Sequence, residues 1–563
     1  MFFSSLSACV RPSAVARALA AFTLAALAAC SGGRGTTSVP IPAAPPPAHD
    51  GTASVVFTMH WNAKPPSAAL RSPKYIGSAL SIAVTVNGGT PQYLNSPVTT
   101  MTLDAPVGTD TFAFTTYDEP NGNGNVIGKA SVTKAIVLGK ANTVSAALEG
   151  VVASFAIALS KANPNAGVPA TVQVEVNVFD ADGNVIAGSS ANYSQPIALS
   201  ISDPQKSGTL SLSRTTVASR AQIATMTYNG GTLWSADVVG TASGLPESRA
   251  TFAPTPTFYQ FSIPVSTNRP QWIAAGSDGN MWFTENPGSK VARITPAGVV
   301  TEFTIPTANA QPQKIIGASD GNLWFTEFTT TPSSTSKIAR VTTTGTFTEF
   351  STLYAPPPPD NPLGLVDRKD GNIWYVAEGS SRVGFQSVGG GTAGETSIPT
   401  ANASPFDIAT APDNNLYYTE VGTDKIGRIT NLFTAQSEIS LVTGTTPESI
   451  VRGPDGNLWF TEFGRSSIGR LSPSSFSVTG EFPTLTPNAQ PTGIVVGADG
   501  ALWFTENGLD RIGRITTGGT VTEYASPVTG LGLRGIAVAP DGSLWFCEPG
   551  TASNPGRIGK LVY

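Results

Sequence analysis

Glutamate is the side chain most able to do chemistry in the second half of this sequence, because it recurs at the end of a repeated apolar run. In its commonest form the run reads Leu-Trp-Phe-Thr-Glu. Six copies end in this residue: Glu285, Glu327, Glu420, Glu462, Glu506 and Glu548. Hard cations take oxygen ligands, so a ring of these carboxylates would suit Mg²⁺ or Ca²⁺. Proton transfer has fewer candidates, since the chain has only 2 histidines, His49 and His60.

A structural ion pair within each repeat is the alternative interpretation of these glutamates. A basic residue follows each of them, in four copies at a distance of eight positions. The third copy has lost both groups and carries Ala377 and Phe385 instead. A buried carboxylate needs a partner, so this joint loss favours ion pairs over a metal ring. The predicted pairs are Glu285–Arg293, Glu327–Arg340, Glu420–Arg428, Glu462–Arg470 and Glu506–Arg514.

The repeat that positions these residues predicts a β-propeller over residues 257–563. Each copy has four strand-like segments, and an Asp-Gly turn joins the first two, because glycine adopts positive φ easily. The turn aspartates recur every 42 to 50 residues, at Asp278, Asp320, Asp370, Asp413, Asp455, Asp499 and Asp541. A period near 42 with four strands per copy is typical of propeller blades. We therefore predict seven blades, with the repeated tryptophans packed between them rather than stacked on sugars.

The seventh copy is incomplete, because the sequence stops before its fourth strand. The missing segment occurs at the other end of the repeat region, where residues 259–264 match residues 301–306. An open array of blades would leave an unpaired strand edge. We therefore predict that this first segment completes the last blade and closes the ring.

Residues 51–150 and 151–252 are each predicted to form a β-sandwich, so the whole chain is expected to be all-β. Short apolar runs alternate with turn-forming residues in both segments. The second segment resembles bacterial Ig-like modules. Neither segment carries a group of residues suited to chemistry, which favours stalk or adhesion-type modules.

The first 50 residues are predicted to direct export and membrane attachment. Arg11 and Arg17 precede a short apolar stretch, residues 18–29, which is too short to span a bilayer stably. The stretch ends in Leu-Ala-Ala-Cys, which resembles the lipobox of bacterial lipoproteins. The resemblance implies that residues 1–29 are removed as a signal peptide and that Cys30 is lipidated, with a proline-rich tether over residues 30–50. An ordinary signal peptide with an incidental cysteine is the alternative.

Composition narrows the classes of partner. The net charge is −5, charged residues are 13% of the chain, and no basic stripe is visible, which argues against nucleic acid. Cys547 has no disulfide partner if Cys30 is lipidated, and we expect it to be buried. We expect a monomeric chain in the cell envelope, anchored by lipid at the outer membrane or cell surface. Its partner would be a small molecule, a peptide or an envelope component.

The repeat also resembles a known enzyme family. Its elements Pro-x-x-Ile, Asp-Gly-Asn, Leu-Trp-Phe-Thr-Glu and Ile-Gly-Arg-Ile are similar to those of the virginiamycin B lyase (streptogramin lyase) family, over residues 257–563. The resemblance implies a seven-bladed propeller that opens a cyclic depsipeptide by elimination across its ester, with Mg²⁺ and a histidine base. That histidine commonly stands second in Pro-x-x-Ile. The second positions here are Gln271, Gln313, Leu363, Phe406, Glu448, Thr492 and Arg534.

No histidine stands where the resemblance implies one. The family's functional histidines map to Arg534 and Thr492, and its acidic residue maps to Glu548. A second family carboxylate maps to Gly532. Arginine cannot accept a proton, whereas an elimination needs a group that does so near neutral pH.

We therefore predict a propeller that binds a ligand without the family's catalytic histidines. The alternative is a metal-dependent carbon–oxygen lyase acting on cyclic depsipeptide lactones, in which Glu548 is the candidate catalytic residue and Glu548 and Glu506 are candidate metal ligands. A lactonase-like hydrolase is a third hypothesis, but no mixed Glu/Asn/Asp ligand set supports it. The residues themselves establish no cofactor, and Mg²⁺ follows only from the resemblance.

Overall fold

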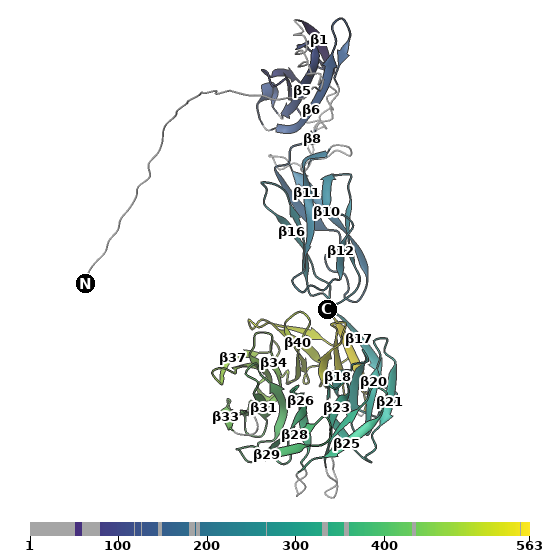
Figure 1. Cartoon of the computed structure of the whole chain (residues 1–563), viewed down its shortest axis with the longest axis vertical. Helices are drawn as coiled ribbons and strands as arrows, with labels where there is room; N and C mark the ends of the chain where they lie inside the picture. Colours follow the sequence, from purple (N-terminus) through teal and green to yellow (C-terminus); the bar gives the residue numbers. More distant parts are fainter. Residues whose placement is uncertain are drawn as a thin grey trace, which may run out of the picture. The chain divides into compact units, whose positions relative to one another are not determined.

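The computed structural model describes residues 51–58, 79–117, 119–124, 126–144, 149–179, 186, 192–265, 267–328, 336–353, 360–430, 435–551 and 553–563 (Figure 1). The predicted signal peptide, Cys30, the tether, His49 and His60 lie outside these residues. Regular structure in the described ranges consists of strands and short 3₁₀ turns, and no helix there has the length and hydrophobicity needed to cross a bilayer. The prediction of an all-β chain is confirmed.

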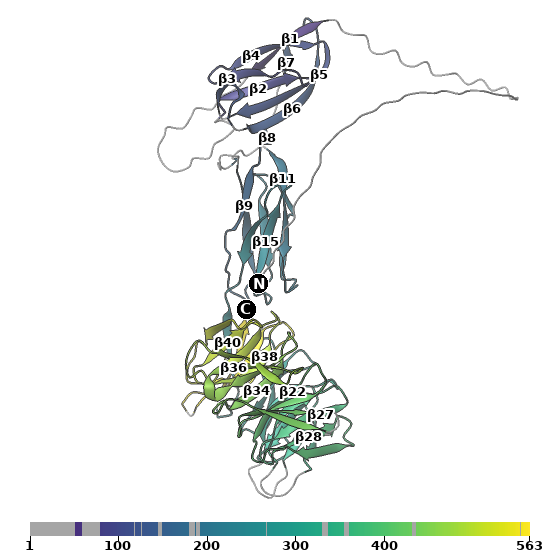
Figure 2. The same cartoon turned by 90° about the vertical axis from the view of Figure 1, so that its left-hand side faces the viewer.

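Two sheets contribute to the hydrophobic core of residues 53–144 (Figure 2). The strands of the first sheet, in spatial order, are β4 (Thr100–Pro106), β1 (Thr52–Thr58) and β7 (Asn142–Thr143). The second sheet contains β6 (Val126–Ile136), β5 (Gly108–Tyr117), β2 (Ser81–Val86) and β3 (Gln92–Asn95). Phe57 packs edge-on against Phe112 and Phe114, with ring centroids 5.6 Å apart in both pairs. Such aromatic pairs add to the stability gained by burial.

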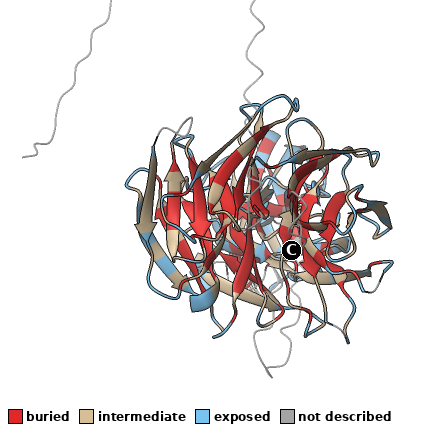
Figure 3. Cartoon of the chain, turned by 90° about the horizontal axis from the view of Figure 1, so that it is seen from below, coloured by how far each residue is buried: buried red, intermediate tan, exposed pale blue. Residues whose placement is uncertain are grey.

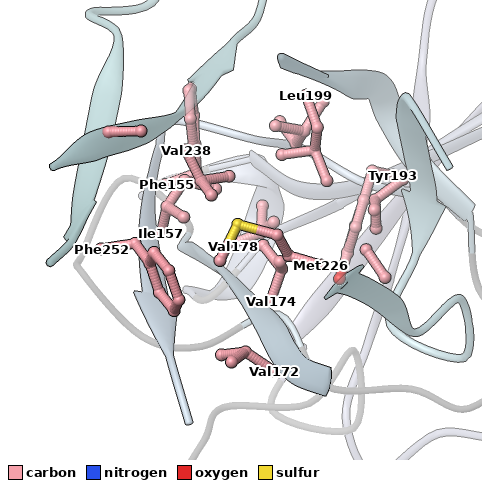
Figure 4. Close-up of a cluster of buried hydrophobic side chains, with 14 of the residues drawn as sticks. Phe155, Ile157, Val172, Val174, Val178, Tyr193, Leu199, Met226, Val238 and Phe252 are labelled. Atoms are coloured by element: carbon pink, nitrogen blue, oxygen red, sulfur yellow. The ribbon is translucent and has the colours of Figure 1, made fainter. Parts of the chain in front are cut away.

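A separate core lies within residues 152–252 (Figure 4). One contributing sheet contains β12 (Leu210–Leu212), β14 (Ala224–Tyr228), β10 (Ala170–Phe179) and β9 (Ser154–Leu159). The other contains β16 (Ser248–Phe252), β15 (Ala236–Thr241), β11 (Asn192–Ser202) and β13 (Thr216–Ser219). Burial alternates along β14, where Ala224, Met226 and Tyr228 point inward, as expected of a strand with one covered face. The two-residue strand β8 (Glu149–Gly150) pairs with both β6 and β11.

Seven four-stranded antiparallel sheets occupy the described residues from 257 to 562. The innermost strands are β18 (Pro270–Ala275), β22 (Gln311–Gly317), β26 (Pro362–Asp367), β30 (Pro405–Thr410), β34 (Pro447–Arg452), β38 (Pro491–Val496) and β42 (Ile536–Val538). The second strands are β19 (Met281–Glu285), β23 (Leu323–Phe328), β27 (Asn372–Ala377), β31 (Leu416–Glu420), β35 (Leu458–Glu462), β39 (Leu502–Glu506) and β43 (Leu544–Glu548). We call each sheet a blade and number the blades from the one that contains β18.

The third and fourth strands form the outer half of each blade. The third strands are β20 (Lys290–Ile294), β24 (Lys337–Val341), β28 (Arg382–Ser387), β32 (Lys425–Ile429), β36 (Ser467–Ser472), β40 (Arg511–Ile515) and β44 (Arg557–Val562). The outer strands are β21 (Val300–Thr304), β25 (Phe347–Ser351), β29 (Ala393–Ser397), β33 (Gln436–Ser440), β37 (Ser477–Pro483), β41 (Val521–Ala525) and β17 (Thr257–Ser262).

The outer strand of the last blade comes from the start of the repeat region. Strand β17 pairs antiparallel with β44, with Thr257 opposite Val562 and Ser262 opposite Arg557. Residues 259–264 were predicted to supply this strand, and the strand covers residues 257–262. Closure in this way pairs the edge of β44 that would otherwise be exposed.

The second strands are buried along nearly their whole length, and Figure 3 shows buried residues in red. Trp282 is fully buried and stacks on Phe303 of the outer strand, with ring centroids 5.2 Å apart. Its indole Nε1–H donates to the turn residue Asp278, 3.2 Å away. The next glycine, Gly279, has a φ of 77°, which suits a residue without a side chain. The tryptophans therefore serve the core, as predicted.

Contacts also join the residues between β14 and β15 to the last blades. The Leu233 N–H donates to the Tyr563 carbonyl, 2.8 Å away. Trp234 lies edge-on to Trp503 at 6.1 Å, and the Arg514 guanidinium lies 4.0 Å from the centre of its ring. A cation over an indole face is an attractive contact, so Trp234 is fixed from two sides.

Candidate ligand site at the inner strands

The threonine that precedes five of the six recurring glutamates fixes the backbone of two neighbouring inner strands. Thr284 Oγ1 accepts from the Trp272 N–H at 3.3 Å and donates to the Gln313 carbonyl of the next blade at 2.7 Å. The same onward bond is made by Thr326, Thr419, Thr461 and Thr505. Buried backbone carbonyls need such partners. These bonds therefore hold the second position of Pro-x-x-Ile in place in five of the seven blades.

The second-position residues Gln271, Gln313, Leu363, Phe406, Glu448, Thr492 and Arg534 are called here the second-position ring. They stand at the start of the inner strands, and the register puts that start beside the end of each second strand, with Pro270 opposite Glu285. In five blades the backbone of this ring is held by the repeated bond, whereas its seven side chains are of six different types. Constant backbone with variable side chains is the arrangement expected of a site that selects a ligand.

The third position of the same element brings the inner strands close together. Three blades have glycine there, and a Cβ on Gly364 would lie 2.5 Å from the Cα of Asp407. A Cβ on Gly535 would lie equally close to the Cα of Trp272. No real side chain tolerates such a distance, so glycine is required for the approach of neighbouring inner strands.

Lys314 and Asp407 stand at the third position of blades two and four, and their side chains form an ion pair. The Lys314 ammonium lies 2.6 Å from Asp407 Oδ2 and 4.1 Å from the centre of the Trp272 ring. Asp407 also accepts from the Ile450 N–H at 3.2 Å. Blades two, four and five are thereby joined, across the blade whose third position is Gly364. A buried pair with further hydrogen bonds is strongly destabilised when one partner is removed.

A cavity of about 530 Å³ lies between the inner strands, on the side of this ion pair towards the ends of those strands. Its lining includes Trp272, Lys314 and Asp407 together with later residues of all seven inner strands, but none of the second-position ring. The ring therefore faces the opposite side of the Lys314–Asp407 pair from this cavity.

Glu448 is the acidic member of the second-position ring. Burial raises its pKa to about 7, and the charges of Arg534 and then Lys314 oppose that rise. Its Oε2 is buried and has no hydrogen-bond partner. Arg534 Nη1 donates to Gln271 Oε1, 3.3 Å away. The ring thus places a carboxyl group that titrates near neutral pH within the electrostatic reach of two cations.

The recurring glutamates face the outer half of their blades. Glu285, Glu327, Glu420, Glu462, Glu506 and Glu548 are all buried, and burial is the main cause that raises their pKa values to about 7 or 8. A glutamate of the outer strand lies beside most of them, as Glu349 lies beside Glu327. No group of three His, Cys, Asp or Glu side chains within the described ranges could hold a metal ion.

The predicted ion pairs between these glutamates and the arginines of the third strands are wrong. The register puts Glu285 opposite Lys290 and Arg293 opposite Trp282. An eight-residue separation would bring Glu285 and Arg293 together only if the hairpin were centred between them. The loop before β20 is shorter than that, so Arg293 lies at the other end of the blade.

The arginines instead interact with the turn aspartates and the tryptophans, or with neighbouring residues. The ion pairs Arg293–Asp278, Arg340–Asp320 and Arg514–Asp499 span 3.6, 3.8 and 2.7 Å. Arg428 lies over the ring of Phe476, and Arg470 over the ring of Trp459. The carboxyl groups therefore lie beside the outer strand of their own blade and not beside the predicted arginines. This holds for Glu285, Glu327, Glu420, Glu462 and Glu506.

Blade three replaces both of its missing groups from neighbouring residues. Asp360 accepts a hydrogen bond from Ser380 Oγ and lies beside Glu395 of the outer strand, and burial raises the Asp360 pKa to about 7. Arg368 forms an ion pair with Asp370 at 3.6 Å, and its guanidinium lies 5.6 Å from the centre of the Trp374 ring. The absence of both the glutamate and the arginine in this copy therefore does not mean that an ion pair between them was lost. Each group made a separate contact, and a different residue of blade three makes each contact instead.

Glu548 and Glu506 occupy the same structural position in adjacent blades. Gln260 Nε2 donates to both oxygens of Glu548, at 3.0 and 3.1 Å, and Ser526 Oγ donates to Oε1 at 3.3 Å. Both oxygens of Glu506 are buried without a hydrogen-bond partner, and Glu523 lies beside it. The Mg²⁺ implied by the family resemblance has no matching set of donors around either carboxyl in the described residues. Roles for them in catalysis or metal binding stay predictions.

A family model described as the virginiamycin B lyase family matches residues 248–437 and 433–561, more than half of the chain. The chain belongs to this family. Among solved structures, streptogramin B lyase is 32% identical over 54% of this chain and 97% of its own, with a TM-score of 0.49. A catalytically inactive histidine-to-alanine variant of virginiamycin B lyase from Staphylococcus aureus, solved with quinupristin, is 30% identical over 55% of this chain and 100% of its own, also with a TM-score of 0.49. A comparison with curated proteins found no match.

The second-position ring of this member of the virginiamycin B lyase family contains no histidine. The sequence named all seven members of that ring, but it gave no reason to single out Glu448. Lys314, Asp407 and Trp272 were missed entirely. Their signal was present, because polar or aromatic residues vary at the third position of a repeat that is otherwise regular. The sequence alone does not show that the side chains of these three residues contact one another.

Proposed function

We propose that this member of the virginiamycin B lyase family is a ligand-binding protein whose seven-bladed propeller holds its ligand at the second-position ring. The observation that carries the proposal is the identity of two ring members: Arg534 and Thr492 stand where the family resemblance implies histidines. Neither side chain can serve as a base near neutral pH. The buried Lys314–Asp407 pair gives the ring a rigid floor.

We propose further that the chain is exported and lipid-anchored through Cys30. In this proposal residues 51–150 and 151–252 are two β-sandwich modules, the second Ig-like, that stand between the anchor and the propeller. The ligand is then a small molecule, a peptide or an envelope component outside the cytoplasm. The two separate hydrophobic cores of these segments support the division.

Incubation with quinupristin tests the binding function. The full-length chain in detergent is titrated with quinupristin by calorimetry, and the mixture is analysed by mass spectrometry with and without Mg²⁺. We expect a heat of binding and no linear product. Absence of binding would contradict a depsipeptide-sized site at the ring. Linear product would contradict a function limited to binding.

A carbon–oxygen lyase is the second candidate, and Glu448 is the observation that favours it. Its pKa of about 7 suits a group that accepts a proton at neutral pH. If linear product forms, its loss in Glu448→Gln would identify that carboxyl as the base. Its loss in Glu548→Ala, with Glu448→Gln active, would identify Glu548 instead.

A further inference from the structure

The cavity between the inner strands has an apolar wall. Its lining includes the fourth and fifth residues of all seven inner segments, counted from the first residue of Pro-x-x-Ile. The fifth residue is alanine in blades one, four and seven, at Ala274, Ala409 and Ala537, and isoleucine or valine in the other four. Five of these seven side chains are only half-buried, so part of their apolar surface faces the cavity. Such surface favours an apolar occupant.

The two ends of this cavity differ in charge. Trp272, Lys314 and Asp407, all at the third position, line the inner end. The Lys314 ammonium lies 2.6 Å from Asp407 Oδ2, so the two charges at this end compensate each other. Arg452, the sixth residue of blade five, lines the other end and is exposed, so the cavity opens to solvent there. The cavity therefore has a compensated ion pair at its inner end and a cation at its open end.

The groups at the open end favour an anion. Arg452 has no ion pair or side-chain hydrogen bond with any residue that the structure describes. Asp367 also lines this end, but its Oδ2 accepts from the Ser319 N–H at 2.7 Å and its Oδ1 from the Lys369 N–H at 2.8 Å. Backbone donors stabilise an ionised carboxylate, so Asp367 already has its partners. Thr410 Oγ1, in the same lining, is buried and has no hydrogen-bond partner in the described ranges.

The length of the cavity suits a short aliphatic chain. A strand rises about 3.3 Å per residue, so the third to sixth residues of an inner strand span roughly 10 Å. An extended chain of about eight carbons has a similar length, because C–C bonds measure about 1.5 Å. The simplest ligand with an apolar body and an anionic end is therefore an aliphatic carboxylate.

We propose that this cavity binds an unbranched aliphatic carboxylate, with its chain against the fifth residues of the inner strands and its carboxylate beside Arg452. The end of the chain then lies near Trp272 and the Lys314–Asp407 pair. This site goes beyond the proposed function, because none of the second-position ring lines the cavity. It therefore stands or falls independently of quinupristin binding.

Two brominated octanoates test both binding and the orientation of the chain. Bromine quenches indole fluorescence on contact, and Trp272 is the one tryptophan among the described residues that lines the cavity. One probe carries bromine on its terminal carbon and the other carries it beside the carboxylate, so the two have similar hydrophobicity. Each is titrated into the full-length chain in detergent, against a detergent blank.

The proposed orientation brings the terminal bromine to Trp272 and leaves the other bromine at the open end. We expect saturable quenching by the terminal bromide, at least threefold stronger than by its isomer, and loss of this quenching in Trp272→Phe. Equal quenching by the two probes, no quenching by either, or quenching that persists in Trp272→Phe would overturn the proposal.

Variants at the two ends of the ligand test its contacts, with octanoate displacing the terminal bromide. Arg452→Gln should weaken octanoate binding about fivefold, the upper range for an exposed ion pair. Lys369→Gln is the matched control, because it removes an exposed cation beside Asp367 that lies outside the cavity lining, and it should change affinity less than twofold. Ala537→Phe fills the cavity and should abolish binding.

The two charge variants decide the outcome even if Ala537→Phe does not fold, since both alter exposed side chains. Unchanged affinity in Arg452→Gln, or an equal loss in Arg452→Gln and Lys369→Gln, would refute a carboxylate site at Arg452. Full binding by a folded Ala537→Phe would show that the chain lies elsewhere.

Discussion

The buried glutamate pair of blade two makes a quantitative prediction about stability and pH. Burial, and then the charge of Glu349, raise the pKa of Glu327 to about 8 from its ordinary value of 4.5. The folded protein therefore keeps a proton on Glu327 that the unfolded chain loses above pH 4.5. A raised pKa stabilises the fold at low pH, and this contribution is lost as pH rises towards 8.

The magnitude follows from the two pKa values. Each pH unit between 4.5 and about 8 removes ~1.4 kcal/mol from the free energy of unfolding. The full loss is about 5 kcal/mol as an upper limit. Glu327→Gln has the shape of the protonated side chain and no proton to lose. It should match wild type near pH 5 and exceed it at pH 8, by several degrees in the unfolding temperature.

The matched control is the other member of the pair. Burial raises the pKa of Glu349, but hydrogen bonds from Lys337 and Thr307 outweigh it and hold the pKa below its ordinary value. Glu349→Gln removes the partner of Lys337, 2.9 Å away, and should destabilise the protein at pH 8. Scanning calorimetry of the full-length chain at pH 5 and 8 measures both variants. An unchanged pH profile in Glu327→Gln would refute the reasoning.

Three further predictions concern contacts elsewhere in the last blades. Trp234→Ala removes a ring held by Trp503 and Arg514 and should cost about 2–4 kcal/mol of stability by calorimetry; a change below 0.5 kcal/mol would show that the contact contributes nothing. Asp499→Asn leaves the Arg514 guanidinium, 2.7 Å away, without its carboxylate, and a loss of about 3 kcal/mol is expected in denaturant titrations, whereas a neutral outcome would contradict that. Cys547 is fully buried, and burial raises the pKa of its thiol, so Ellman's reagent should modify it only after unfolding; rapid reaction of the native chain would exclude this placement.

The local features of the repeat were predictable because each depends on residues close in the sequence. Asp278 and Gly279 form a turn whatever surrounds them, since one supplies an acceptor and the other a positive φ. The segment that begins at Thr257 could be assigned to the last blade because it matches the missing element of the incomplete repeat.

Pairings that depend on register could not be predicted in the same way. Glu285 and Arg293 have the right charges and a plausible separation, but the loop between β19 and β20 sets which residues meet. A shift of a few residues along a hairpin exchanges every partner. The compensating residues of blade three, Asp360 and Arg368, also lie outside the strands that carry the pattern.

The candidate site was hardest to predict because its parts come from different blades. Glu448, Arg534 and Lys314 are each ordinary surface-type residues in the sequence. Their burial and mutual influence arise only when the inner strands surround one axis. The resemblance to the family directed attention to Arg534 and Glu548, and the structure adds Glu448 to them.

The pairing of β17 with β44 determines when, during synthesis of the chain, the propeller can close. About 300 residues separate the two strands in the chain, so β17 leaves the ribosome long before its partner is translated. Until then the last blade has no third strand for β17 to join, and the ring stays open. Contacts between such distant segments form slowly. A chain secreted from its first residues onward would therefore emerge on the far side of the membrane with its propeller unfinished. If the chain is exported, as we propose, the ring can close only after β44 has been translocated.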